Sequence, residues 1–258
     1  MGIAEHSEND AGRLGVLDIL VVVVLLAGAA AVWRWDAPLS EYLTRVSPDF
    51  GARLSTFAIK PFRMLGKADV VFFLMVFLCW ATGNRRLLWR FIWAMAASGL
   101  VVLLLKVAVG RVRPNGHSLS FPSGDSQTAL VWAAVLAAEY PLVAIPAFLS
   151  ASGVAILRVT DGAHYPSDVL VGSALGFAGA KAAALKIRGV PGWFCRTMQG
   201  TRWGVIGLGS SALYVTLRTA VEGKPSVLIL TAFVVGTTAA ILAVRKRLRR
   251  SKSDIESH

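Results

Sequence analysis

The sequence alternates long apolar runs with short polar joints, and most of the runs are long enough to predict helices that cross a membrane. The pattern predicts eight spans, at about Leu14–Trp33, Ala68–Thr82, Leu87–Val109, Asp125–Glu139, Leu142–Leu157, Ser167–Leu185, Trp203–Ala220 and Val227–Val244. We take the first span as an uncleaved anchor, because the acidic residues before it make a poor positive region for a signal peptide. The chain is therefore expected to be an all-α integral membrane protein.

The segment 34–67 is less regular than the spans. Leu39, Tyr42, Leu43 and Val46 recur at helical spacing, which favours an amphipathic helix at the membrane interface. An ordinary loop without membrane contact is nearly as compatible with this composition.

Composition supports a single membrane domain over residues 1–258. Hydrophobic residues make up 55% of the chain, mean hydropathy is +0.60, and only 16% of residues are charged, against about 25% in soluble domains. The net charge of +12 comes mostly from the joints and the C-terminus, so it indicates topology and lipid-headgroup contact and no nucleic-acid partner. Cys79 and Cys195 offer no metal-binding spacing, and we expect neither a metal nor another cofactor.

Three basic segments set the expected orientation: residues 85–90, 186–202 and 245–252. With eight spans they share one face, which the positive-inside rule makes cytoplasmic. The six basic residues of segment 34–67 argue mildly against this assignment. Loops 110–125 and 158–168 then meet at the opposite face.

The second of these loops carries candidate catalytic residues. His164 and Asp168 are four residues apart, and Pro166 is suited to open a helix between them. The Asp168 carboxylate could then hold one imidazole nitrogen and leave the other free to act as a nucleophile. Arg158 would supply a planar fork for an anion such as phosphate. A capped helix start with an incidental histidine would look the same in this segment alone.

The first loop offers further anion ligands. Lys106 and Arg113 are seven residues apart and can point the same way. Ser123 or Asp125 could cap the following helix, whose first amides form an anion site. Taken singly, a lysine reaching toward headgroups and an ordinary helix cap explain these residues equally well.

The combination is more specific than its parts. Lys-x6-Arg-Pro at 106–114, Pro-Ser-Gly at 122–124 and Arg-x5-His-x3-Asp at 158–168 occur in that order. This series resembles the three motifs of the type 2 phosphatidic acid phosphatase family, over roughly residues 54–185. The resemblance implies a six-span helical bundle with residues 54–185 as the catalytic core. The spans within 203–244 are then an accessory transmembrane hairpin.

The resemblance also implies roles for the motif residues. His164 would form a phosphohistidine, oriented by Asp168. The phosphoryl oxygens would be bound without a metal by the remaining motif residues: Lys106, Arg113, Ser123, Gly124 and Arg158. The substrate would be a phosphorylated membrane lipid.

The sequence departs from the family pattern at two places. Leu157 replaces a serine, which matters little for chemistry. Asp125 replaces the histidine of Pro-Ser-Gly-His, the residue expected to protonate the leaving group. Asp125 could act as the acid, His117 could substitute, or activity could be lost. We favour retained catalysis because the nucleophile and the phosphate ligands are intact. A missing acid would favour lipid diphosphates over phosphomonoesters of alcohols.

The sequence thus predicts a lipid phosphatase in a bacterial inner membrane, with its active site facing the periplasm. Candidate substrates are a polyprenyl diphosphate, phosphatidate, phosphatidylglycerol phosphate or a lipid A phosphate. A lipid phosphotransferase is the nearest alternative, and a non-catalytic lipid-binding or transport protein on the same bundle is a second. No sequence feature specifies an oligomeric state.

Overall fold

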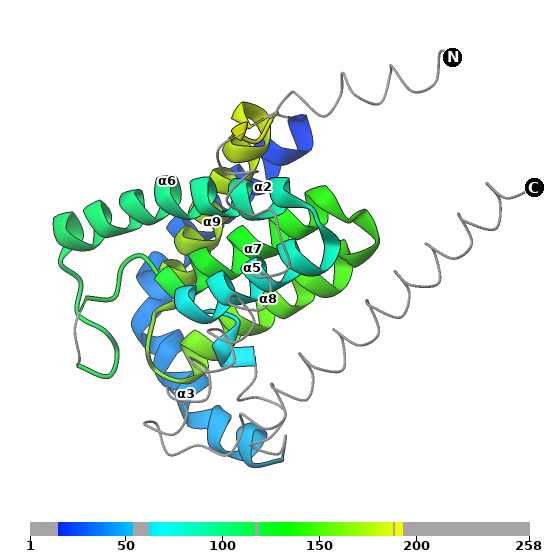
Figure 1. Ribbon diagram of the computed structural model, residues 1–258. Coiled ribbons are helices and arrows are strands. Elements are labelled where there is room, and N and C mark those ends of the chain that lie inside the picture. Colours follow the sequence, from blue (N-terminus) through cyan, green and yellow to red (C-terminus); the bar gives the residue numbers. More distant parts are fainter. Residues whose placement is uncertain (1–14, 54–61, 117–118, 188, 193–258) are drawn as a thin grey trace, which may run out of the picture.

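The structure, a computed structural model, describes residues 15–53, 62–116, 119–187 and 189–192. These residues form helices and connecting loops, and the only strand-like pairing among them is an isolated bridge between Val112 and Leu119. The elements, labelled as in Figure 1, are α2 (Val16–Val32), η1 (Trp33–Trp35), α3 (Asp36–Arg53), α5 (Ala68–Thr82), α6 (Arg85–Val109), α7 (Gly124–Glu139), η2 (Pro141–Val143), α8 (Ala144–Thr160) and α9 (Pro166–Lys186).

The all-α membrane architecture predicted from the sequence is confirmed. Each of the first six predicted spans corresponds to one helix: α2, α5, α6, α7, α8 and α9. Four helical segments within the described residues are long and apolar enough to cross a membrane, at Val16–Val46, Arg85–Val109, Pro141–Thr160 and Pro166–Lys186. The chain is therefore a multi-pass membrane protein. The predicted spans 203–220 and 227–244 lie outside the described residues, and the hairpin stays a prediction.

Local signals explain small differences from the predicted boundaries. Helix α6 begins at Arg85 because the Asn84 side chain accepts hydrogen bonds from the backbone of Arg86 and Leu87, at 3.1 and 3.3 Å. Helix α8 continues to Thr160, three residues beyond the predicted end. In segment 34–67 the helical alternative is the right one, since α3 covers its first part with Leu39, Tyr42 and Val46 exposed.

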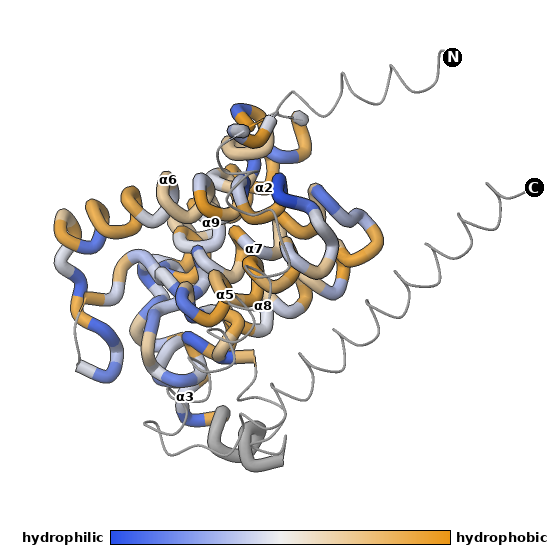
Figure 2. Tube along the Cα trace, viewed as in Figure 1, coloured by the Kyte–Doolittle hydropathy of each residue, from blue (hydrophilic) through white to orange (hydrophobic). Residues whose placement is uncertain are grey.

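Helix α7 occupies the centre of the bundle, packed against α9, α8 and α6 (Figure 1). Its buried side chains include small apolar residues and a polar group at its first turns: Ser126, Gln127 and Thr128. Gln127 donates to Ser98 of α6 at 2.6 Å. In Figure 2, α6 is apolar along most of its length and the loop after it is polar.

Two glycines of α9 allow its close contact with α7. A Cβ atom at Gly172 would lie 2.3 Å from the backbone oxygen of Ser123, and one at Gly176 would lie 2.3 Å from that of Gln127. Small residues at this spacing are typical of closely packed membrane helices. The contact fixes the start of α7 against the start of α9, where the Ser123 amide donates to the Asp168 carbonyl at 3.0 Å.

Charged groups tie the helices together at the other end. Arg90 of α6 pairs with Glu139 at the end of α7 at 2.6 Å, and it also donates to the Ala184 and Ile187 carbonyls at the end of α9. Lys181 of α9 pairs with Asp18 of α2 at 2.7 Å. Both ends of the bundle are thus fixed by named polar contacts.

The α7–α9 contact predicts the effect of adding one methyl group. We expect Gly176→Ala to destabilise the protein by about 1–3 kcal/mol, because a Cβ there overlaps backbone that cannot move aside easily. Thermal unfolding in detergent measures this effect. Gly99→Ala in α6 is the matched control, since a Cβ there meets nothing within 4 Å and alanine is the better helix former. Equal stability of the two variants would contradict the packing argument.

Candidate active site

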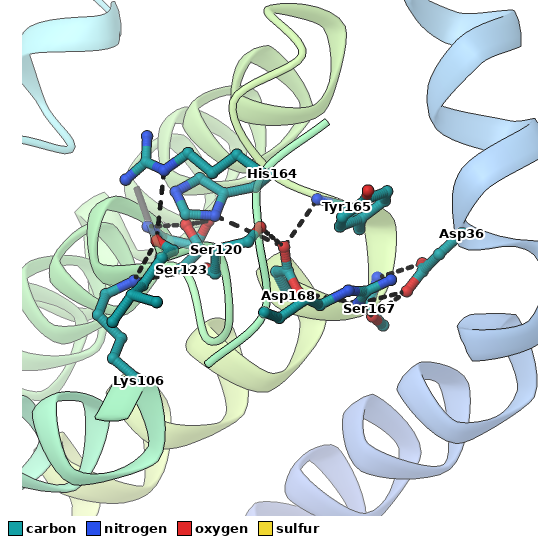
Figure 3. Close-up of polar contacts among 12 residues, drawn as sticks. Asp36, Lys106, Ser120, Ser123, His164, Tyr165, Ser167 and Asp168 are labelled. Atoms are coloured by element: carbon teal, nitrogen blue, oxygen red, sulfur yellow. Dashed lines mark hydrogen bonds and ion pairs between the residues drawn. The ribbon is translucent and has the colours of Figure 1, made fainter. Parts of the chain in front are cut away.

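His164 and Asp168 come together as the sequence predicts. His164 lies in the turn between α8 and α9, with 2% of its surface exposed, and its Nδ1 atom is 3.6 Å from Oδ2 of Asp168. That distance is just beyond a hydrogen bond, so a small shift of the ring completes one. Because Nδ1 faces the carboxylate, Nε2 points to the opposite side of the ring (Figure 3).

The Asp168 carboxylate is held from several directions. It is fully buried in the first turn of α9, where Oδ2 accepts from the Tyr165 amide at 2.8 Å and from the Ser120 hydroxyl. Oδ1 accepts from Arg111 at 3.1 Å. These bonds leave the carboxylate little freedom, so it can orient the imidazole of His164.

Burial lowers the pKa of His164 below its ordinary value of 6.5. The nearby Asp168 carboxylate opposes this effect, and the charges of Arg113 and Lys106 add to it. The imidazole is therefore neutral at neutral pH, which is the form that can attack an electrophile.

Lys106 and Arg113 converge on the loop in front of the histidine. Lys106, in the last turn of α6, donates to the carbonyls of Leu119 and Ser120 at 3.3 and 3.4 Å. Arg113 donates through Nε to the same Leu119 carbonyl at 3.3 Å. Two of the three cations predicted as phosphate ligands thus contact the same loop beside the imidazole.

The start of α7 also matches the prediction. Ser123 is the N-cap, with its hydroxyl accepting from the Ser126 amide at 3.3 Å, and Gly124 is the first helical residue. The first amides of a helix have no partner within it, so they and the helix dipole favour an anion here. Loops 110–125 and 158–168 meet, since the Asn115 amide donates to the Gly162 carbonyl at 3.2 Å.

Arg158 and Asp125 are brought into direct contact. Arg158 donates to Oδ2 of Asp125 at 2.7 Å and to Oδ2 of Asp161 at 3.2 Å. Lys67 donates to the same oxygen of Asp125 at 3.0 Å, and Arg63 pairs with Asp161. The sequence predicts Arg158 as a phosphate ligand but gives no sign of the partners Arg63, Lys67 and Asp161. His117, the other candidate acid, lies outside the described residues.

A second buried carboxylate supports the site from α3. Asp36 is 1% exposed; it accepts from Arg111 at 2.8 Å, from the Ser167 amide at 3.0 Å and from the Ser167 hydroxyl. The Arg111 guanidinium lies between the rings of Trp33 and Tyr165, at 4.4 and 3.8 Å from their centroids. Asp36 and Arg111 are not among the residues predicted from the sequence, and only the position of Arg111 inside the Gly-Arg-Val-Arg-Pro loop hints at a role.

The described residues contain no group of three or more histidines, cysteines, aspartates or glutamates placed to hold a metal ion. The ligands they do offer to an anion are cationic side chains, a hydroxyl and helix amides. Such an arrangement suits a phosphoryl group.

Comparison with known proteins agrees with this chemistry. Residues 87–188 match the model of the PAP2 superfamily, and this range contains all eight predicted site residues. The central part of the chain is thus similar to the PAP2 superfamily. The resemblance drawn from the three motifs is therefore confirmed, whereas Lys67 and Asp36 lie before the matched PAP2 range.

Three curated proteins named lipid A 1-phosphatase are similar to the PAP2 region. The protein from Rhizobium johnstonii is 40% identical over 95 residues, which cover 31% of this chain and 39% of the relative. The protein from Rhizobium etli is 39% identical over 95 residues, which cover 31% of this chain and 41% of the relative. The protein from Porphyromonas gingivalis is 37% identical over 87 residues, which cover 32% of this chain and 20% of the relative. The match thus spans less than half the length of each relative.

Two solved structures are also similar. LpxE of Aquifex aeolicus has 28% identity and a TM-score of 0.44, with 50% of this chain and 83% of that chain covered. A PAP2-type phosphatidylglycerolphosphate phosphatase of Bacillus subtilis has 25% identity and a TM-score of 0.49, with 68% of this chain and 98% of that chain covered.

The site geometry predicts how His164 titrates. We expect its pKa to lie below 6.5, so this group lowers the stability of the fold only as pH falls below that value, where the unfolded histidine takes up a proton first. Histidine NMR in detergent measures the pKa, with His164→Gln identifying the signal. Removing the negative charge by Asp168→Asn should lower the pKa further, and removing a cation by Arg113→Gln should raise it. A pKa above 6.5 in the unsubstituted protein would contradict the described burial.

Proposed function

We propose that this protein is a membrane-embedded phosphatase that removes a phosphate group from a lipid through a phosphohistidine on His164. The observation that carries the proposal is the pairing of a buried, neutral His164 with a fixed Asp168 inside a group of cations. The PAP2 match and the names of the curated relatives support the same reaction class.

The charge of the cluster suits a phosphate ester. Among the described residues, the ion-paired and motif cations of the site are Arg63, Lys67, Lys106, Arg111, Arg113 and Arg158. The carboxylates they face are Asp36, Asp125, Asp161 and Asp168. With His164 neutral, two positive charges remain unbalanced, which matches the charge of a phosphomonoester dianion. A cluster of this kind is expected to bind the ester and stabilise its transition state.

The reaction follows from the roles of these groups. Nε2 of His164 attacks phosphorus while the leaving oxygen departs on the opposite side. Lys106, Arg113 and the Ser123 helix start bind the equatorial oxygens, where charge accumulates. Asp168 orients the imidazole and stabilises its positive charge. Attack by water on the phosphohistidine then releases phosphate and restores neutral His164.

The first substrate to test is lipid A carrying a phosphate at its 1-position. The three curated relatives bear that activity in their names, and their similarity covers the motif-bearing region of this chain. Phosphatidate, phosphatidylglycerol phosphate and a polyprenyl diphosphate complete the set of lipids.

The decisive experiment is phosphate release by the purified full chain in detergent. We expect His164→Ala to lower the rate at least about 10³-fold, because the substitution removes the proposed site of the covalent intermediate. A lipid carrying a labelled phosphate should leave an alkali-stable, acid-labile label on the unsubstituted protein and none on His164→Ala. Transfer of the label to a second lipid would identify a phosphotransferase. Undiminished phosphate release by the His164→Ala protein would rule out the nucleophile, and the absence of turnover in the unsubstituted protein would contradict the function.

We also propose that the site faces the periplasm across a bacterial inner membrane, as the positive-inside rule predicts. Val112, in the site loop, is 58% exposed, and Leu142, at the opposite end of α7, is 98% exposed. In a variant lacking Cys79 and Cys195, an impermeant maleimide added to spheroplasts should label Val112→Cys and not Leu142→Cys. Inside-out vesicles provide the control, where the pattern should reverse. Labelling of Leu142→Cys alone in spheroplasts would invert the topology.

A further inference from the structure

The motif residues of this chain do not include the histidine that is expected to protonate the leaving group. Asp125 occupies the motif position where a histidine would serve. Its Oδ2 atom accepts from both Arg158, at 2.7 Å, and Lys67, at 3.0 Å. Two cations on one oxygen favour the carboxylate form, which accepts hydrogen bonds and has no proton to give. Among the described residues, the candidates for an acid at this place are therefore the neighbours of Asp125.

Lys67 is the neighbour that can release a proton. Arginine holds its proton too strongly to act as an acid, which excludes Arg158. The lysine ammonium carries three N–H groups. One of those of Lys67 is directed at Asp125, and with 34% of its side chain exposed the others are accessible. A lysine in this position offers both positive charge and a transferable proton.

The fold fixes Lys67 in this position. It is the N-cap residue of α5, in a turn closed by its amide, which donates to the Met64 carbonyl at 3.0 Å. The preceding Gly66 packs so closely that a Cβ atom there would lie 2.8 Å from Val154 and 3.1 Å from Cβ of Asp125. The turn before α5 is thus pressed against the start of α7, which brings the ammonium to Asp125.

We propose that Lys67 is the general acid of the phosphatase reaction and that Asp125 holds its ammonium in place; this rests on the function proposed above. As Nε2 of His164 forms the N–P bond and the P–O bond to the leaving group breaks, the Lys67 ammonium gives its proton to the departing oxygen. Water then attacks the phosphohistidine, its proton passes to the Lys67 amine, and the N–P bond electrons return to Nε2. The products are an alcohol and phosphate, and both side chains regain their starting forms.

This assignment changes the substrate expectation drawn from the sequence. Without an acid, the protein should favour diphosphates, whose leaving group needs no proton. With Lys67 in place, phosphomonoesters of alcohols are good substrates, in keeping with relatives named lipid A 1-phosphatase.

The test compares two substrates that differ in their need for an acid. Dodecyl phosphate expels an alkoxide, whereas 4-nitrophenyl phosphate expels a stable phenolate. We expect Lys67→Met to lower kcat/KM for dodecyl phosphate by about 10²–10⁴-fold, and for 4-nitrophenyl phosphate by less than about tenfold. Lys67→Arg should behave like Lys67→Met, because it keeps the ion pair but cannot release the proton. Arg63→Met, which breaks the neighbouring pair with Asp161, is the matched control and should change both substrates by the same factor.

Two double variants separate an acid from a mere counter-charge. Asp125→His with Lys67→Met should regain activity on dodecyl phosphate, since the histidine takes over the proton transfer. Asp125→Asn with Lys67→Met should not, because it restores the charge balance without an acid. Recovery in the second pair, or equal losses on the two substrates in Lys67→Met, would overturn the role of Lys67 while leaving the phosphatase function intact. An unsubstituted protein that is inactive on both substrates would instead overturn the function itself, and this inference with it.

Discussion

The buried carboxylate of Asp168 is the group on which the candidate active site depends. A charge without access to water is costly unless it is paired and hydrogen-bonded. Here Arg111, the Ser120 hydroxyl and the Tyr165 amide donate hydrogen bonds that offset this cost, and these three donors come from two different loops. Satisfying one carboxylate therefore brings loop 110–125 against the start of α9, and His164 is held beside it.

The support for Asp168 extends further than the site itself. Arg111 also pairs with Asp36, and Asp36 accepts from the Ser167 amide in the first turn of α9. An acidic group at that position offsets the positive end of the helix dipole. The aromatic rings of Trp33 and Tyr165 both contact the guanidinium and shield part of it from solvent. The junction of α2 and α3 is thereby joined to the catalytic loops.

The sequence predicts the helices well because a long apolar run is by itself enough to indicate a helix that is buried or in contact with lipid. It also predicts which motif residues meet, because loops on the same face of a membrane bundle must lie near one another. The distances within a motif follow from helix geometry, as for His164 and Asp168. Lys106, Arg113 and Ser123 occupy the positions expected from their spacing.

The contacts that the sequence did not predict join segments far apart in the chain. Asp36 and Ser167 are 131 positions apart, and Lys67 and Asp125 are 58 apart. Neither periodicity nor spacing relates such pairs, and no motif of the family contains Lys67 or Asp36. The replacement of the motif histidine by Asp125 is visible in the sequence. The lysine that accompanies it is visible only in three dimensions.

The short length of α7 has a consequence for how a lipid reaches the site. At about 1.5 Å per residue, the 16 residues of α7 rise about 24 Å, less than the roughly 30 Å of a bilayer's hydrocarbon core. Glu139 fixes one end of α7 to Arg90 near the start of α6, and α6 has 25 residues. The opposite end, which carries Ser123, is therefore recessed below the level that α6 reaches. We expect a substrate to enter sideways from its own leaflet, keeping its acyl chains in the hydrocarbon while only its headgroup sinks toward His164.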